Sequence, residues 1–118
     1  MLGTFVLSAD YYDAYFTKAQ KARKRIIDAT NEVLNKFDFI LIPTASTTAF
    51  TIGKHEGDPL AMYMSDVMTV QASVSGIPAI SIPMSEDKDG MPIGMQIMSK
   101  AFDEQKLFAI SKQLLNEQ

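Results

Sequence analysis

The sequence contains no cysteine. A disulfide framework, a thiol nucleophile and a zinc site built on thiolates are therefore excluded, and the composition fits a reducing compartment. No run of about 18 apolar residues is present, and the first residues lack a basic leader. We therefore predict a soluble, cytoplasmic protein with no membrane contact. The net charge of −3 gives no overall attraction to nucleic acid or to anionic membranes.

Several catalytic and binding motifs are also missing. A search for Walker loops, dinucleotide-binding glycines, the HExxH zinc motif and the EF-hand spacing finds none. The one histidine, His55, lies between Lys54 and Glu56. This setting favours a surface loop over a catalytic triad, which needs a nucleophile and an orienting carboxylate nearby. We predict no catalytic residue and no metal ligand in these 118 residues.

The composition that is present supports one folded unit. A chain of 118 residues is at most a single domain, here taken as residues 1–118. Hydrophobic residues make up 47% of the chain and eight residues are methionine, which is ample for a core of this size. The excess is available for an interface, so we expect the isolated chain to self-associate.

A long helix is predicted over residues 10–35, with Asp10 and Asp13 as a capping pair. Its apolar residues recur at steps of three and four and define one stripe: Tyr12, Tyr15, Ala19, Ala22, Ile26, Ala29 and Val33. A basic cluster lies in its middle, formed by Lys18, Lys21, Arg23, Lys24 and Arg25. This cluster is either a contact for nucleic-acid phosphates or a solvated helix face, and the negative total charge favours the solvated face.

A short apolar run, residues 39–43, is predicted to form a strand buried on both faces and closed by Pro43. Residues 44–48 follow it with four hydroxyl side chains in five positions. Ligands of open α/β sheets bind beyond the carboxyl ends of strands, so Thr44 and Ser46 are candidate substrate-facing residues. A turn whose hydroxyls only satisfy the local backbone is an equally good interpretation.

A central helix is predicted over residues 59–75, capped by Asp58 and stopped by Gly76 and Pro78. Its expected core face consists of Leu60, Met64, Val67, Gln71 and Val74, with Tyr63 and Val70 at the edge. The opposite face carries one charge, Asp66, among small hydroxyl side chains. This face is suited to stand close to a ligand, so Asp66, Thr69 and Ser73 are further candidate site residues.

The last part of the chain predicts a hairpin and a helix. Strands are expected at residues 79–83 and 92–98, joined by a polar turn. A helix is expected over residues 104–116, with Asp103 as N-cap and a hydrophobic staple between Phe102 and Leu107. The predicted fold class is α/β, with about three helices and three mixed strands in two or three layers. Residues 39–42 should run parallel to residues 79–82, and residues 93–98 should return antiparallel.

Two stretches carry a family resemblance. Residues 75–83, Ser-Gly-Ile-Pro-Ala-Ile-Ser-Ile-Pro, and residues 90–97, Gly-Met-Pro-Ile-Gly-Met-Gln-Ile, resemble the C-terminal hallmark of the amidase signature family. Residues 1–8, 11–15, 18–20 and 58–63, together with Asp66, are similar to the branch of that family formed by the A subunits of tRNA-dependent amidotransferases. The resemblance covers essentially the whole chain but only about the last quarter of such subunits.

The resemblance implies a function. Members of the family hydrolyse carboxamides with a Ser–Ser–Lys triad, which would lie upstream of the matching region and has no counterpart here, so we expect the isolated chain to be inactive. The A subunits hydrolyse glutamine and supply ammonia for converting Glu-tRNA(Gln) to Gln-tRNA(Gln) or Asp-tRNA(Asn) to Asn-tRNA(Asn). ATP and Mg²⁺ are handled by the partner B subunit, with a small C subunit, so no cofactor is expected in this chain. Asp66 aligns with the carboxylate that holds the α-amino group of glutamine.

Two alternatives are open. The chain could be part of another amidase signature hydrolase, although residues 11–15 and 58–63 favour the amidotransferase branch. It could also be a non-catalytic binding or interaction module that keeps an amidase-like scaffold.

Overall fold

The computed structural model of the protein describes residues 15–54 and 57–117. The predicted helix start with Asp10 and Asp13 lies outside them, as does His55. None of the helices in the described ranges is long and apolar enough to cross a membrane. In chain order the elements are α2 (Thr17–Lys36), β1 (Ile40–Pro43), α3 (Pro59–Ser65), α4 (Val67–Ser75), β2 (Ala79–Glu86), β3 (Pro92–Met98) and α5 (Glu104–Asn116). The predicted α/β class is confirmed.

The three strands form one sheet in the order β1-β3-β2. Both neighbouring pairs are antiparallel, with Ile97 opposite Leu41 on one side and Ile80 on the other. β1 and β2 run in the same direction, as predicted, but β3 lies between them, so the expectation of mixed strands is wrong for this part of the sheet. The reason is the short turn after β2, which brings β3 back directly alongside β2 and leaves the other edge of β3 for β1.

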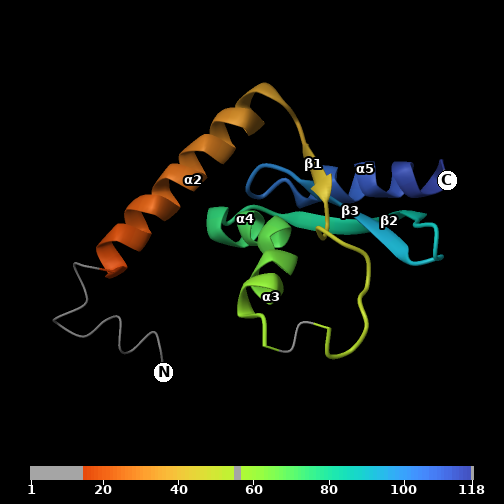
Figure 1. The fold of residues 1–118 in the computed structure, drawn as a ribbon. Helices are drawn as coiled ribbons and strands as arrows, with labels where there is room; N and C mark the ends of the chain where they lie inside the picture. Colours follow the sequence, from red (N-terminus) through yellow and green to blue (C-terminus); the bar gives the residue numbers. More distant parts are fainter. Residues whose placement is uncertain (1–14, 55–56, 118) are drawn as a thin grey trace.

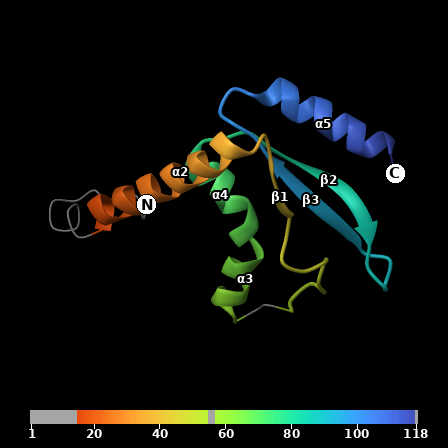
Figure 2. The same ribbon diagram turned by 90° about the horizontal axis from the view of Figure 1, so that it is seen from above.

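Helices cover the sheet on both faces, which gives the three layers seen in Figures 1 and 2. Successive side chains of β3 point to opposite faces. Met95 and Ile97 face α5 and pack in a cluster with Leu107. Met98 faces the other way and packs with Leu34 and Ala72, and these three residues join β3 to α2 and α4.

The predicted central helix is two helices, α3 and α4, because the helical hydrogen-bond pattern is interrupted at Asp66. The Asp66 backbone N–H donates to the carbonyl of Tyr63 at 3.4 Å, three residues back rather than four. The side-chain hydroxyls of Ser65 and Thr69 donate to the carbonyls of Met62 and Asp66, at 2.6 and 3.0 Å. Hydroxyl side chains that bond the local backbone compete with the helical ladder, and here they flank the break.

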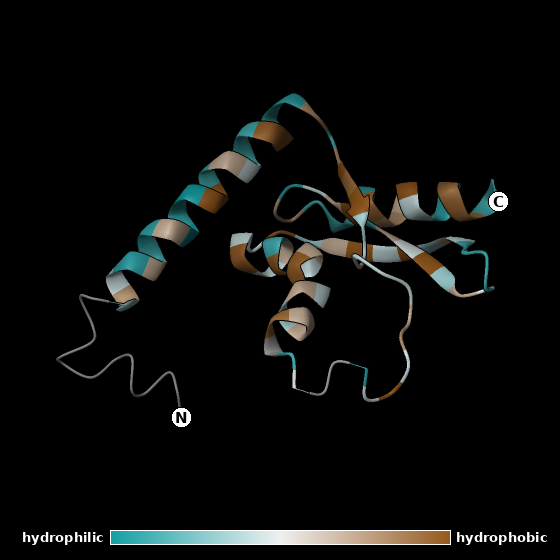
Figure 3. Ribbon diagram, in the orientation of Figure 1, coloured by the Kyte–Doolittle hydropathy of each residue, from teal (hydrophilic) through white to brown (hydrophobic). Residues whose placement is uncertain are grey.

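The predicted core faces of α2 and of the central helix are largely exposed in the described structure. Leu60 is 71% exposed and Tyr63 83% exposed, and Met64, Val67 and Val70 are exposed too. Most of the α2 stripe is likewise uncovered, and the side chains of α2 that are buried are Thr30 and Leu34. Figure 3 shows the hydrophobic bands that run along α2, α3 and α4. The predicted staple is wrong, because Phe102 is 95% exposed while Leu107 is buried.

Thr30 joins α2 to α4 through its hydroxyl. Its side chain is buried, and Oγ1 accepts hydrogen bonds from Gln71 Nε2 at 3.1 Å and from Ser75 Oγ at 3.3 Å. A buried acceptor with two donors holds the two helices in one register, because the donors have no equivalent partner if it is removed.

We expect Thr30→Val, which keeps the shape but removes the hydroxyl, to lower the free energy of unfolding by about 1–3 kcal/mol. Thr30→Ser keeps the hydroxyl and loses one methyl group, so its cost should be nearer 1 kcal/mol. Urea denaturation of both variants measures the difference. A Thr30→Val protein as stable as the parent would show that these hydrogen bonds do not hold α2 against α4.

Candidate functional site

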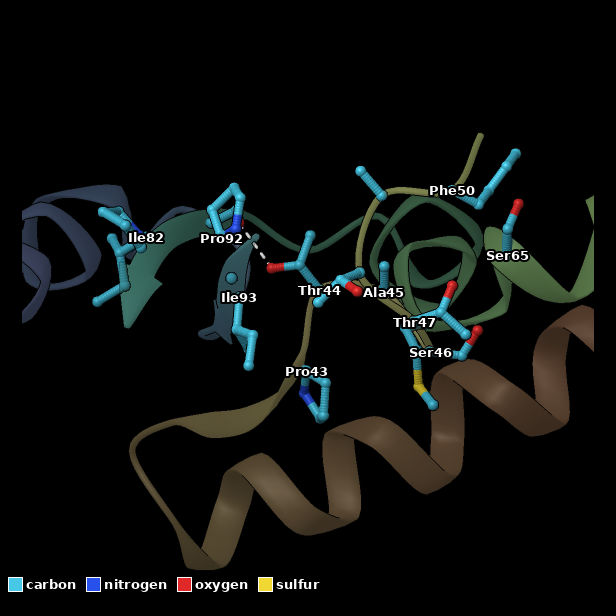
Figure 4. A pocket seen from close by; sticks show the side chains of 16 residues that line it. Pro43, Thr44, Ala45, Ser46, Thr47, Phe50, Ser65, Ile82, Pro92 and Ile93 are labelled. Atoms are coloured by element: carbon cyan, nitrogen blue, oxygen red, sulfur yellow. Dashed lines mark hydrogen bonds between the residues drawn. The ribbon is translucent and has the colours of Figure 1, made fainter. Parts of the chain in front are cut away.

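A cleft of about 810 Å³ opens beyond the carboxyl end of β1. Residues 43–50 form one wall, and Ser65 and Met68 at the α3–α4 junction form another. Its floor comes from the middle of β2 and the start of β3. Figure 4 shows Thr44 between Pro92 and Ile93 on one side and the Ser46–Thr47 turn on the other. The cleft therefore lies beside the loop of hydroxyl residues that follows β1.

Thr44 is fixed to both other strands. Its backbone N–H donates to the carbonyl of Gly94 at 2.9 Å, and its Oγ1 is hydrogen-bonded to Ser81 Oγ at 2.6 Å. A Cβ atom on Gly94 would lie 2.9 Å from Thr44 Oγ1 and 3.1 Å from Ser81 Oγ. The hydroxyl pair thus occupies the space that a side chain at position 94 would need. A glycine inside an apolar strand is a known sign of close approach, and the sequence analysis missed it.

The loop of hydroxyl residues 44–48 is held by hydrogen bonds at two further points. Ser46 Oγ donates to the carbonyl of Met64 at 3.4 Å, which links the loop to α3. Thr48 Oγ1 donates to Asp87 Oδ2 at 2.8 Å, which links it to the β2–β3 turn. Thr44 and Ser46 both line the cleft, as do Thr47 and Ser65, which the sequence analysis did not single out. The hydroxyls therefore serve as structural anchors and as cleft lining at once.

Asp87 organises the turn between β2 and β3. Its Oδ1 accepts from the backbone N–H groups of Asp89 and Met91, each at 2.9 Å, while Oδ2 accepts from Thr48. The Met91 N–H and then the Thr48 hydroxyl hold the pKa of the Asp87 carboxyl below its usual value, with a smaller contribution from Asp89. Hydrogen bonds to the charged form favour that form. One carboxylate thus joins the hairpin to the loop that walls the cleft.

The other candidate residues are not among those that line the cleft. Thr69 donates its hydroxyl to the carbonyl of Asp66, and Ser73 is exposed on α4. Asp66 is exposed at the α3–α4 break, between Ser65 and Met68, which do line the cleft. Its carboxylate makes no capping hydrogen bond to α4. The side chain is therefore not used to start the helix that follows it.

The side chains that line the cleft are suited to binding. Its described lining consists of hydroxyl, apolar and proline side chains, with no lysine, histidine or carboxylate among them. No group of three or more His, Asp or Glu side chains that could hold a metal occurs in the residues described. Hydroxyls donate and accept hydrogen bonds, so this wall suits a neutral polar group such as a carboxamide.

Because the folded-state pKa of Asp87 is lowered, its contribution to stability is complete above the unfolded aspartate value of about 3.9 and is lost as the pH falls through the lower folded value. We expect Asp87→Asn to be less stable than the parent at pH 7, and we expect that gap to close below about pH 4. Urea midpoints from pH 7 to pH 2.5 measure this. Asp89→Asn, in the same turn, is the matched control. A gap that stays constant with pH would contradict the assignment.

The comparison with protein families gives one match. The family model described as Amidase covers residues 1–108 of the chain.

The curated relatives include A subunits of glutamyl-tRNA(Gln) amidotransferase from several organisms. The A subunit of glutamyl-tRNA(Gln) amidotransferase from Maricaulis maris is 48% identical over 110 residues, which is 93% of this chain and 22% of the relative. That of Pelagibacter ubique is 50% identical over 111 residues, which is 94% of this chain and 23% of the relative. The chain therefore spans less than a quarter of the length of these two subunits.

The solved structures agree. The crystal structure of the glutamyl-tRNA(Gln) amidotransferase A subunit from Thermotoga maritima superposes with a TM-score of 0.79 at 47% identity, over 92% of this chain and 24% of that one. A bacterial aryl acylamidase of the amidase signature family matches with a TM-score of 0.67 at 26% identity, over 92% of this chain and 23% of the other. The sequence and fold comparisons agree, and the chain belongs to the amidase family.

Proposed function

We propose that the chain is the C-terminal part of the glutamine-hydrolysing subunit of a tRNA-dependent amidotransferase. One observation carries this proposal. The chain is 46–50% identical to A subunits of glutamyl-tRNA(Gln) amidotransferase, whereas the aryl acylamidase, which shares the fold, is 26% identical. A difference of this size favours the amidotransferase over a general amidase.

In this proposal the chain supplies one wall of the glutamine site. The hydroxyls of residues 44–48 and Ser65 face a cleft whose lining is uncharged, which suits the carboxamide of the substrate. The Ser–Ser–Lys triad implied by the family resemblance would come from the three quarters of the subunit that lie outside these residues. These hydroxyls are already held by hydrogen bonds, so little free energy is needed to order them when a substrate binds. In this proposal they position the substrate and take no part in bond cleavage.

Asp66 is proposed to bind the α-ammonium group of glutamine. Its carboxylate is exposed, does not cap α4 and follows Ser65, a cleft residue. A charge-assisted hydrogen bond of this kind contributes about 1.5–3 kcal/mol. Thr69 and Ser73 are proposed as neighbours that keep this side of the helix small and polar.

The remaining parts of the proposal concern the complex. We propose that the B and C subunits of the amidotransferase are the partners, that ATP and Mg²⁺ act through the B subunit, and that tRNA is contacted indirectly. The product ammonia would convert Glu-tRNA(Gln) to Gln-tRNA(Gln), or Asp-tRNA(Asn) to Asn-tRNA(Asn), in the cytoplasm. The names of the relatives support the first of these reactions.

The isolated 118-residue chain should release no ammonia from glutamine. A positioned substrate without an activated nucleophile gains no assistance in the chemical step. A coupled ammonia assay on the purified chain, against a mock preparation, measures this. Activity that co-purifies with the chain and is absent from the mock preparation would contradict the proposal.

The role of Asp66 is tested in a chimera in which this chain replaces the matching quarter of the Thermotoga maritima protein. Asp66→Asn should raise KM for glutamine about ten- to a hundredfold, since each tenfold corresponds to about 1.4 kcal/mol. Asp58→Asn is the matched control, because Asp58 accepts from the Ala61 N–H at 3.0 Å and asparagine caps a helix equally well. An unchanged KM in the Asp66 variant, with steady-state kinetics otherwise normal, would show that Asp66 is a surface residue that does not bind glutamine.

A further inference from the structure

Thr48 is a cleft residue whose hydroxyl has a defined direction. It lines the cleft, its side chain is half-buried, and its Oγ1 donates to Asp87 Oδ2 at 2.8 Å. This distance is typical of a good hydrogen bond between a hydroxyl and an oxygen. In the pair formed by Thr44 and Ser81 either hydroxyl can be the donor, and the Ser46 hydrogen bond is longer, at 3.4 Å. Of these hydroxyls, Thr48 therefore has the most firmly placed proton.

The placement of that proton follows from the state of Asp87. Its Oδ1 accepts from the backbone N–H groups of Asp89 and Met91, each at 2.9 Å, and the turn thereby orients Oδ2 toward Thr48. The N–H of Met91 and then the hydroxyl of Thr48 hold the pKa of the Asp87 carboxyl below its usual value, so the group is ionised at neutral pH. An ionised carboxylate accepts hydrogen bonds and has no proton to donate. The proton between the two side chains therefore belongs to Thr48.

This arrangement decides what Thr48 can offer to a ligand. A threonine hydroxyl has one proton and two lone pairs. Because the proton is directed to Asp87, Oγ1 offers the cleft only its lone pairs. An N–H group in the cleft can donate to this oxygen, whereas a carboxylate brings only further acceptors. Thr48 is therefore suited to a primary carboxamide and not to the carboxylate that its hydrolysis would produce.

We propose that Thr48 Oγ1 accepts a hydrogen bond from the carboxamide NH2 group of glutamine, and that Asp87 is the positioning residue that keeps Thr48 as an acceptor. The pair then helps the site to bind glutamine in preference to glutamate, the product of its hydrolysis. This inference rests on the proposed function. Asp87 does not line the cleft and acts through Thr48. A polar atom that binds a donor disfavours an analogue without that donor, because the atom is then left unpaired.

Thr48→Val in the Thermotoga maritima chimera keeps the shape of the side chain and removes the acceptor. We expect KM for glutamine to rise about three- to tenfold, which is the effect of losing one neutral hydrogen bond. The Ki of glutamate as a competitive inhibitor should stay the same or fall, because an unfavourable acceptor has been removed. The ratio of Ki for glutamate to KM for glutamine should therefore fall by about threefold or more. Thr48→Ser keeps the hydroxyl and should keep the ratio of the parent.

Asp87→Asn tests the positioning role separately. The new amide group can donate to Thr48 Oγ1, which frees the hydroxyl proton to point into the cleft. Glutamate should then bind more tightly, and the same ratio should fall about threefold or more. Asp89→Asn is the matched control, because the backbone N–H that Asp89 gives to Asp87 is unchanged. Steady-state kinetics of all four variants, with glutamate as inhibitor, measure these effects.

Equal increases of KM and Ki in Thr48→Val would overturn the proposal, because a loop that is only loosened weakens the binding of both ligands alike. Unchanged constants in that variant would also overturn it. If Thr48→Val does not fold, as judged by its urea midpoint, Asp87→Asn decides the matter, and an unchanged ratio there overturns the proposal. An active parent chimera with unchanged ratios refutes only this inference, whereas a parent chimera without glutaminase activity refutes the proposed function and this inference with it.

Discussion

The pairing of β3 with a strand on each side is the constraint on which the rest of the structure depends. Ile97 and Met98 are fully buried, one toward α5 and the other toward α2 and α4, so one strand carries the core of both faces. Gln96 Nε2 donates to the carbonyl of Met68 at 3.2 Å, which ties α4 to the same strand. Gly94 leaves the space in which β1 and β2 are joined through Thr44 and Ser81. β3 therefore fixes the positions of both helical layers and of the residues that line the cleft.

The position of the cleft follows from this arrangement of the strands. β1 ends at Pro43, and the chain must leave the sheet there, so the hydroxyls that follow are presented beside the strands and not buried among them. Four hydrogen bonds then hold the loop, to Gly94, Ser81, Met64 and Asp87. A loop fixed at four points is suited to position a substrate. The described lining of the cleft carries no charged side chain, which suits a neutral polar group such as a carboxamide.

The ends of several helices were predictable from the residues at those positions. Asp58 caps α3, and Gly76 ends α4 in the left-handed conformation at φ 70°, as the sequence indicated. The exposure of the apolar faces of α2, α3 and α4 was not predictable, because apolar periodicity indicates a face that is suited to burial but does not show what covers it. The break at Asp66 was missed because it depends on the hydroxyls of Ser65 and Thr69 bonding to nearby carbonyls. The role of Gly94 needed the strand order, which periodicity does not give.

The most direct test of the account is a crystal structure of the Thermotoga maritima chimera with glutamine bound. The central claim is that this chain walls the glutamine site. The account predicts that the glutamine carboxamide lies in the cleft beside residues 44–48 and that its α-ammonium lies within hydrogen-bonding distance of the Asp66 carboxylate. Glutamine bound without contact to either element, with Asp66 turned to solvent, would contradict it.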